Sequence, residues 1–294
     1  MSGYTANGNG WPACPPDRIV AFQGQLGAYS HLACRQRFPE LEAGPCHAFE
    51  DAFAAVREGR ARLAMIPVDN TVAGRVADVH HLMPQSGLFI TGEHFLRVNH
   101  NLLGVRGATL EGVRQVESHV HALGQCRQFI RRHGLKPRVV ADTAGAAAEI
   151  ARAGDPSRAA IASALAAEIH GLVILHGDIE DAAHNTTRFL VLSREPARSA
   201  ADAGPVVTTF VFRVRNVPAA LYKALGGFAT NGVNMVKLES YIDGAFTQAR
   251  FYADIIGHPE AEPVRLAMEE LQFFAHDVEI LGVYPADRFR EGFG

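Results

Sequence analysis

The sequence predicts an α/β region over residues 17–195, followed by a smaller module over residues 205–285 with the element order βαββαβ. Two observations support this prediction. In the first region short apolar strands alternate with amphipathic helices, which is the pattern of α/β architecture. The segment SREPARSAADAGP (193–205) is rich in Ala, Ser, Pro and charged residues, which is typical of a linker. After this linker the order of predicted strands and helices changes.

Each element of the first region has a local reason. Short apolar runs bounded by turn residues predict strands, and apolar residues at helical spacing predict helices. The strands are RIVAFQG (18–24) and LAMIPV (63–68), and the helices are AYSHLACRQRF (28–38), VADVHHLM (76–83), QCRQFIRRHG (125–134) and AGAAAEIARAG (144–154). The alternation predicts sheets covered by helices.

The second region has four predicted strands, at 206–214, 233–241, 246–256 and 277–284. Asp243-Gly244 marks the turn between the middle two. Helices are predicted at 218–231, with Pro218 in the first turn, and at 262–276, because apolar residues recur on one face of each. This is the ferredoxin-like plan. Two helices on one face would leave the other face, or the sheet edge, free for a partner.

Composition excludes several classes of function. The net charge is −3 and no basic stripe occurs, so a nucleic-acid partner is not expected. No apolar run approaches the ~20 residues that span a bilayer. Residues 1–16 lack the features of a secretory signal and are predicted to be disordered, so a cytoplasmic location is expected.

The cysteines, at 14, 34, 46 and 126, have no metal or redox spacing and should be free thiols, with Cys34 and Cys126 in the core. No metal site is expected either. His176, Asp178, Asp181 and His184 lie close together in the sequence but lack a recognised ligand spacing. His80 and His81 lie on a predicted helix, as surface or capping residues.

Small polar side chains recur where predicted strands meet helices. In FQGQLGAYS (22–30), Gly24 and Gly27 permit a sharp turn, and the following helix start could bind an anion. IPVDNTVAGRV (66–76) places polar groups at the end of a strand, where they either cap the next helix or contact a ligand. Ser118 and Thr143 occupy similar junctions. None of these groups is a strong base, so the set suits holding an anion better than attacking an ester.

The segment HNTTRFLVLS (184–193) places polar residues just before the apolar run 189–192, which is predicted to be a short buried strand. A hydroxyl, an amide and a guanidinium together suit a small anionic ligand. The same residues are also typical of a turn that leads into a strand.

The segments GQLGAYSH, IPVDNTVAGRV, SHVHALGQC, DTAGAA, NTTRF and VNMVKLES occur in an order that resembles bacterial prephenate dehydratase, over about residues 18–284. The last segment lies in a module that looks like an ACT domain, the phenylalanine-sensing unit of that family. The resemblance implies two α/β subdomains, similar to periplasmic binding proteins, with the active site in the cleft between them. It implies no cofactor or metal, because aromatisation of prephenate drives the reaction.

The resemblance also assigns residues. The Thr-Arg-Phe triplet of the family falls on Thr187, Arg188 and Phe189, and its Glu-Asn-Ser motif on 69–71, where aspartate and threonine replace the outer two residues. We expect Thr187 to assist the leaving hydroxyl, Arg188 to bind a carboxylate or brace the loop, and Phe189 to pack. The candidate substrate contacts are Asn70, Thr71, Asn185, Ser118, Thr143, Tyr29 and Ser30.

In the ACT-like module, the family's Pro-Gly-Ala-Leu and Glu-Ser-Arg-Pro motifs fall on 218–221 and 239–242, with Ala219, Tyr241 and Ile242 as departures. We expect a homodimer or homotetramer that binds phenylalanine there. The candidate contacts are Asn216, Ala219, Ala220, Leu221, Asn234, Glu239 and Ser240. Two alternatives stay open: an arogenate dehydratase, with Asp69 selecting the amino group, and an amino-acid sensor without activity.

Overall fold

The computed structural model describes residues 11–197, 204–215, 217–242 and 249–293. Its contacts divide the chain into two compact units. The first unit holds the chain up to Val79 together with His94–Phe189, and the second holds His80–Glu93 and the chain from Leu190 onward. The second unit is therefore discontinuous in sequence, whereas the sequence predicted two consecutive regions.

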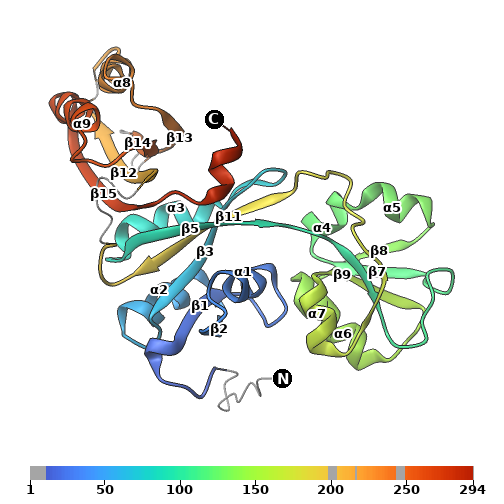
Figure 1. Ribbon diagram of the computed structural model, residues 1–294. Coiled ribbons are helices and arrows are strands. Elements are labelled where there is room, and N and C mark those ends of the chain that lie inside the picture. The colour runs from blue at the N-terminus through green and yellow to red at the C-terminus, as the bar shows by residue number, and fades with distance from the viewer. Residues whose placement is uncertain (1–10, 198–203, 216, 243–248, 294) are drawn as a thin grey trace. The chain divides into compact units, whose positions relative to one another are not determined.

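The first lobe of the first unit is built on a mixed sheet with the strand order β2-β1-β3-β11-β5 (Figure 1). Strand β1, second in this order, is parallel to both neighbours and is almost wholly buried, because its apolar sequence IVAF packs under helices. The strands are β1 (Ile19–Gln23), β2 (Glu42–Cys46), β3 (Leu63–Asn70), β5 (Phe89–Arg97) and β11 (Thr186–Ser193), with β4 (Gly74–Arg75) paired to β3 and helices α1 (Tyr29–Arg37) and α2 (Phe49–Arg57) alongside.

The second lobe has the strand order β10-β6-β9-β7-β8, in which β7 is parallel to β8 and β9 while β6 is antiparallel to β9 and β10. Alanine-rich α6 packs closely on the sheet because its small side chains let the backbones approach. The elements are β6 (Asn101–Gly104), β7 (Gln115–Ser118), α4 (Val120–Gln125), α5 (Arg127–Arg132), β8 (Lys136–Val139), α6 (Thr143–Ala153), β9 (Arg158–Ala162), α7 (Ala164–His170) and β10 (Val173–His176).

Two segments connect the lobes, at residues 98–100 and 177–185, and they are hydrogen-bonded to each other. The amide N–H of Ile179 donates to the carbonyl of His100 (2.9 Å), and that of Val98 donates to the carbonyl of Asn185 (2.8 Å). Two mixed α/β sheets joined by paired crossovers form the binding-protein-like plan that the sequence predicted. The lobes also meet at Gly27, whose carbonyl accepts from the Ser163 hydroxyl at 2.6 Å.

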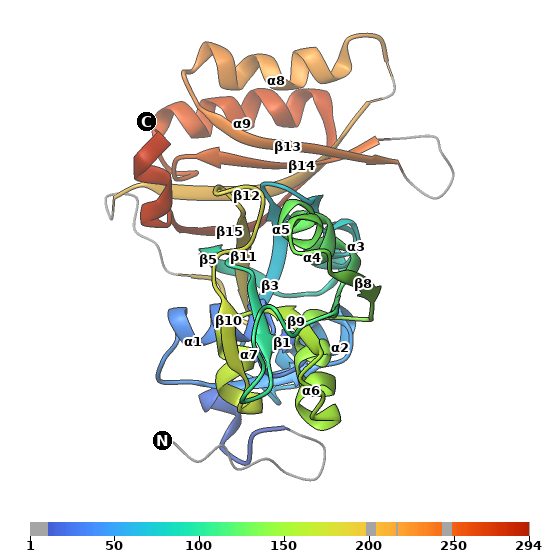
Figure 2. The ribbon, with the colours of Figure 1, turned by 90° about the vertical axis from the view of Figure 1, so that its right-hand side faces the viewer.

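The second unit contains the ferredoxin-like module, with the antiparallel strand order β13-β14-β12-β15 (Figure 2). Helices α8 and α9 cover one face, where Phe210 and Phe212 pack with Phe228 and Leu271. The elements are β12 (Val206–Val214), α8 (Ala220–Thr230), β13 (Met235–Ile242), β14 (Ala249–Ile256), α9 (Glu262–Phe274) and β15 (Ala275–Pro285). The predicted order βαββαβ is confirmed.

The prediction that the opposite face of this sheet stays free was wrong. It is covered within the same unit by α3 (Ala77–Leu82) and the start of β5. The ring of His80, which was expected at the surface or as a cap, is buried edge-on against Tyr252, with ring centroids 5.0 Å apart. The carbonyl of Ile90 lies so close to Gly282 that a side chain there would clash.

The final segment of the chain is tied to the same covering strand. Arg290 donates from Nε (2.6 Å) and Nη2 (2.9 Å) to the two carboxylate oxygens of Glu93, which is almost fully buried on β5. The backbone N–H of Asp287 also donates to Glu93 Oε1, at 3.1 Å. Glu93 is thus held by groups about 200 residues away in sequence.

Several element boundaries differ from the prediction. Residues 11–16, expected to be disordered, are ordered, because Trp11 packs on Gly44. Helix α8 begins at Ala220, so Pro218 precedes the helix, and β11 begins at Thr186, so Thr186, Thr187 and Arg188 lie in the strand itself. Residues 1–10, Asn216 and the Asp243-Gly244 turn lie outside the described residues.

Cys34 and Cys126 are buried in the core, and burial raises the pKa of both thiols. No helix within the described ranges is long and apolar enough to cross a membrane. The same ranges contain no group of three or more His, Cys, Asp or Glu side chains that could hold a metal ion.

Candidate active site

The hydroxyl of Thr187, at the start of β11, is held by the side chain of Asn70, at the end of β3. Asn70 Nδ2 donates to Thr187 Oγ1 at 2.9 Å and to Asn185 Oδ1 at 2.8 Å. Its oxygen, Oδ1, accepts from the backbone N–H groups of Val72 (2.9 Å) and Ala73 (2.7 Å). The two backbone donors therefore fix which end of the Asn70 amide faces Thr187.

The local sequence explains why β3 and β11 meet at this point. Thr71 donates from its hydroxyl to the carbonyl of His184 (2.6 Å) and accepts from the backbone N–H of Thr186 (2.9 Å). Its own N–H donates to the carbonyl of Thr186 at 3.0 Å. Asn70 thus caps the turn between β3 and β4 rather than a helix, and Thr71 fastens that turn to β11.

The polar network extends from Asn185 into the second lobe. Asn185 Nδ2 donates to Gln125 Oε1 at 2.9 Å, and the same oxygen lies 2.7 Å from His100 Nε2. His100 Nδ1 lies 2.8 Å from the hydroxyl of Tyr29, which also contacts the carbonyl of Asn99 at 2.8 Å. Burial raises the pKa of Tyr29 well above its ordinary value, so the phenol keeps its proton.

The structure brings four of the predicted site residues into one network: Thr187, Asn70, Asn185 and Tyr29. Two members were not predicted, Gln125 and His100. Gln125 lies within SHVHALGQC, a segment that the sequence singled out, but it is the last residue of α4 and no local pattern marks its side chain. His100 lies on the first crossover, where only the fold shows its contacts.

Arg188 is almost completely buried, with 6% of its surface exposed. Its Nη1 atom lies 3.8 Å from Asp69 Oδ2, next to Asn70 on β3. Because side chains alternate along a strand, Arg188 points to the opposite face of β11 from Thr187. Phe189 shares the face of Thr187 and is fully buried in the core.

The remaining predicted contacts occupy helix and strand ends. Ser118 is fully buried and donates to the carbonyl of Ile161 (2.6 Å), so its hydroxyl ties β7 to β9. Thr143 begins α6, whose first turn is capped by Asp142 through the N–H of Gly145 at 2.6 Å. Ser30 lies in the first turn of α1, where Ala28 gives no side-chain cap. The first turn of α1 is therefore better suited to an anion than that of α6.

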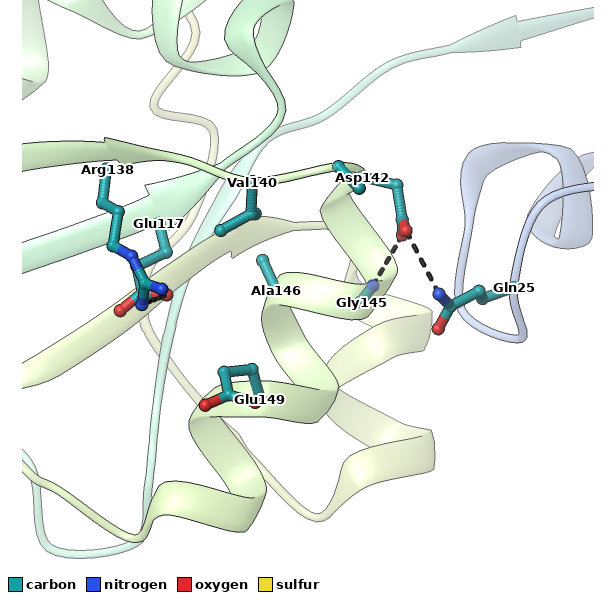
Figure 3. Close-up of a pocket in the computed structure, with 9 residues that line it drawn as sticks. Gln25, Glu117, Arg138, Val140, Asp142, Gly145, Ala146 and Glu149 are labelled. Atoms are coloured by element: carbon teal, nitrogen blue, oxygen red, sulfur yellow. Dashed lines mark hydrogen bonds and ion pairs between the residues drawn. The ribbon is translucent and has the colours of Figure 1, made fainter.

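A pocket of about 350 Å³ in the second lobe does not include Thr187 or Gln125 (Figure 3). Its fully buried acid, Glu117, is held by Arg138 (3.0 Å) and Arg158 (2.7 Å). Burial raises the pKa of Glu117, but hydrogen bonds and the charges of both arginines outweigh it, so its pKa lies below the ordinary value. A compensated acid of this kind is a structural ion pair. At the pocket's edge Gln25, from the first lobe, donates to Asp142 at 3.2 Å.

In the second unit, the two segments predicted to bind an effector lie at the same end of the sheet. The register pairs Arg213 on β12 with Arg250 on β14, and Arg250 with Tyr241 on β13. Ala219 is exposed with a left-handed backbone (φ 60°), Ala220 is buried and Leu221 is half-buried. Asn234 and Ser240 are exposed, and Glu239 lies 3.7 Å from Lys237.

Two α/β lobes joined by paired crossovers, with hydroxyl and amide groups gathered at the join, form the plan of a two-lobed enzyme, and the ferredoxin-like unit matches an ACT domain. Residues 20–197 match the family model described as "Prephenate dehydratase". The chain belongs to the prephenate dehydratase family, whose enzymes are carbon–oxygen lyases.

Individual relatives cover almost the whole chain. A Komagataeibacter europaeus protein named "Bifunctional N-acyl-homoserine lactone acylase/prephenate dehydratase" is 53% identical, over 93% of this chain and 98% of its own length. An Arabidopsis thaliana protein, "Arogenate dehydratase/prephenate dehydratase 2, chloroplastic", is 37% identical over 91% of this chain and 73% of its own length. The prephenate dehydratase of Arthrobacter aurescens, solved in complex with L-Phe, is 28% identical. Its structure matches with a TM-score of 0.82 over 91% of this chain and 89% of its own chain.

Proposed function

We propose that this prephenate dehydratase uses Thr187 as the hydrogen-bond donor to the departing hydroxyl group of prephenate. One observation supports the assignment. Thr187 Oγ1 accepts a hydrogen bond from Asn70, and within the described part of the chain its own proton has no acceptor. A hydroxyl that accepts from a fixed donor presents its proton to whatever lies on its other side. The side chain is half-buried, so it stays accessible to a ligand.

The reaction needs little more than such a donor. The bond between the ring and its carboxylate breaks, and the electron pair enters the ring as the C–O bond to the hydroxyl breaks. Carbon dioxide and hydroxide leave, hydroxide takes up a proton to become water, and phenylpyruvate remains. A threonine is far too weak an acid to act in ionised form, so Thr187 stabilises the developing charge through its hydrogen bond or relays the proton.

Asp69 and Arg188 support prephenate rather than arogenate as the preferred substrate. Arogenate carries an amino group in place of the pyruvyl ketone, and an uncompensated acid near the site would select it. Here Asp69 faces the buried guanidinium of Arg188 at 3.8 Å, so its charge is already compensated. The same contact supports the bracing role for Arg188. The backbone N–H groups of Tyr29 and Ser30, at the uncapped start of α1, are the proposed contacts for a substrate carboxylate.

The experiment is a comparison of kcat/KM for prephenate and arogenate on the purified protein. Phenylpyruvate from prephenate is followed by its absorbance in alkali, and phenylalanine from arogenate by chromatography. We expect prephenate to be the better substrate. A higher kcat/KM for arogenate would overturn the assignment and return Asp69 to the role of a selecting acid.

The acylase activity in the name of the Komagataeibacter relative calls for a different chemistry. Acyl transfer uses a nucleophile activated by a neighbouring base. The Thr187 hydroxyl instead accepts a hydrogen bond from an amide, which does not activate it. The site therefore gives no support for an acylase role of Thr187. An N-acyl-homoserine lactone, tested beside prephenate on the same protein, serves as the control substrate that Thr187 is not expected to cleave.

We further propose that the ACT domain binds phenylalanine and that the protein acts as a dimer or tetramer. The L-Phe complex of the Arthrobacter relative supports the binding, as does the placement of the 218–221 and 239–242 segments at one end of the sheet. Binding inhibits only if phenylalanine has different affinities for the active and inactive states. Titration of activity and calorimetry on the whole protein, with light scattering for its mass, test both points. No heat of binding would mean that Ala219 and Tyr241 have abolished sensing.

A further inference from the structure

A chain of hydrogen bonds leads from Thr187 to two residues that do not touch it. We propose that His100 and the hydroxyl of Tyr29 are positioning residues, which hold three side-chain amides in the one orientation that leaves the proton of Thr187 for the substrate. This inference rests on the proposed function of Thr187. The reasoning depends on which atoms donate and which accept, and the fold fixes that at one end.

The direction of the chain starts at Asn70. Backbone N–H groups are always donors, so the atom that Val72 and Ala73 contact is the amide oxygen of Asn70. The nitrogen of Asn70 then faces Asn185, whose facing atom must be an acceptor, its oxygen. The nitrogen of Asn185 consequently faces Gln125 and requires an acceptor there in turn. Each amide passes its orientation to the next.

The chain of amides ends at an imidazole. Gln125 Oε1 accepts from Asn185 and lies 2.7 Å from His100 Nε2, so Nε2 must carry a proton. This holds whether the ring is neutral or charged. A nitrogen without a proton at this position would repel the oxygen and favour a reversed Gln125. Because backbone donors fix Asn70, a reversed Gln125 would set its amino group against that of Asn185, or a reversed Asn185 against that of Asn70, and the repulsion would shift Asn70 relative to Thr187.

Tyr29 completes the arrangement on the far side of the ring. Its hydroxyl has one proton and contacts both His100 Nδ1 and the carbonyl of Asn99. If Nδ1 is unprotonated, Tyr29 donates its proton to Nδ1, and the single N–H of the neutral ring lies on Nε2. If Nδ1 is protonated, it donates to Tyr29, and Tyr29 donates to Asn99. In the second state Nε2 keeps its proton only if the ring is charged, so the neutral ring donates to Gln125 only when Tyr29 donates to Nδ1.

The position of the two residues suits this role. His100 lies on the first crossover and Asn185 on the second, while Tyr29 begins α1 and Gln125 ends α4. The backbone N–H of His100 donates to Glu180 Oε2 at 2.9 Å, which fixes the ring's point of attachment. His100 is 2% exposed, so solvent does not compete for its contacts. The network therefore spans the join of the two lobes and ends at the Thr187 hydroxyl.

The test uses two substitutions of similar size at His100. In His100→Gln the amide nitrogen can reach the place of Nε2 and donate to Gln125. In His100→Asn the shorter side chain reaches only the place of Nδ1, so the donor from the Nε2 position to Gln125 is lost. We expect His100→Asn to lower kcat for prephenate roughly 10-fold to 100-fold, as supporting residues of active sites do, with KM changed much less. His100→Gln should recover most of that loss.

The decisive measurement is a double-mutant cycle with Thr187→Ala. If His100 acts through Thr187, His100→Asn should cost almost nothing further in the Thr187→Ala protein. Equal losses in both backgrounds, or a His100→Gln protein as impaired as His100→Asn, would overturn the inference. If His100→Asn does not fold, Tyr29→Phe replaces it in the same cycle, because it removes only the hydroxyl. A Thr187→Ala protein with normal kcat would overturn the proposed function as well, so the two failures are distinguishable.

Discussion

Two threonines, one in each unit, occupy polar networks of opposite kinds. In the second unit, the Thr209 hydroxyl donates to Asp254 at 2.6 Å and meets the hydroxyl of Tyr284 at 2.7 Å, and all three residues are fully buried. In the first unit, Thr187 accepts from Asn70 and is half-buried. A closed network stabilises a fold, whereas a network with one donor left over is arranged for a ligand.

Removing the donor at Thr187 should give the largest effect. Thr187→Ala is expected to lower kcat by about 10²–10³, because one transition-state donor is lost. The melting temperature should change little, since no buried partner other than the Asn70 amide loses a contact. Steady-state kinetics with prephenate measure this. Thr187→Ser keeps the hydroxyl and Thr186→Ala leaves it in place, so both should be much milder; equal losses in Thr187→Ala and Thr186→Ala would contradict the division of roles.

His31 extends the comparison to a group that can titrate. Its Nδ1 accepts from the N–H of Gly27 at 3.0 Å, and burial, with help from the charge of Arg35, lowers its pKa from 6.5 to about 4. The unfolded chain therefore binds the proton more readily. The contribution of neutral His31 to the free energy of unfolding is fully present above about pH 6.5. It is lost as the pH falls toward 4, by about 1.4 kcal/mol per pH unit and by roughly 3 kcal/mol in total.

The measurement is urea denaturation at about pH 7.5 and about pH 5, each compared with His31→Asn. Asparagine can place an acceptor near the Nδ1 position but cannot be protonated. The variant should lose less stability than the parent protein between the two pH values. An identical loss in both proteins would show that His31 is not the group responsible.

A substitution in the closed network around Thr209 should lower the free energy of unfolding and leave kcat unchanged. Thr209→Val keeps the shape of the side chain but leaves Asp254 and Tyr284 without their shared partner. We expect a loss of roughly 1.5–3 kcal/mol in the free energy of unfolding, the usual contribution of a hydrogen bond to a charged group. Urea denaturation and prephenate kinetics on the same sample separate the two properties. A large fall in kcat with normal stability would contradict the contrast between the two threonines.

The smallest expected effect concerns Ala219, which precedes α8 with a left-handed backbone (φ 60°). This conformation costs a non-glycine residue roughly 1 kcal/mol, so Ala219→Gly should raise stability by about 1 kcal/mol or less. Activity without effector should be unaltered. Calorimetry with phenylalanine then shows whether the methyl group hinders the ligand, and Ala220→Gly, at a buried helical position, is the control that should destabilise instead.

The sequence predicted those features that depend on neighbouring residues. The βαββαβ order followed from apolar spacing within each segment. Asn70, Asn185 and Thr187 lie in short polar runs that adjoin apolar strands, and the family resemblance assigned them to the site. Gln125 and His100 were missed because their role depends on contacts across 60 and 25 residues, between segments that meet only when the two lobes join. The spacing of apolar residues within one segment gives no information about such contacts between distant segments.

The same reason explains the two errors about the second unit. The helix 77–82 was recognised, but its apolar side gave no sign of which sheet it would cover. His80 therefore looked like a surface residue and is in fact packed on Tyr252. The face of the sheet looked available because the segment that covers it lies more than a hundred residues earlier in the chain.

The discontinuity of the second unit sets a limit on modular engineering of this enzyme. A gene cut in the linker near residue 203 would look like a clean separation of catalysis from regulation. It would instead sever one folded unit, because residues 80–93 would lose the sheet that they cover. Glu93 would keep its buried carboxylate but lose its ion pair with Arg290, and breaking a buried pair is destabilising. Chimaeras that exchange sensing domains between relatives would have to carry α3 and the first half of β5 with the new domain.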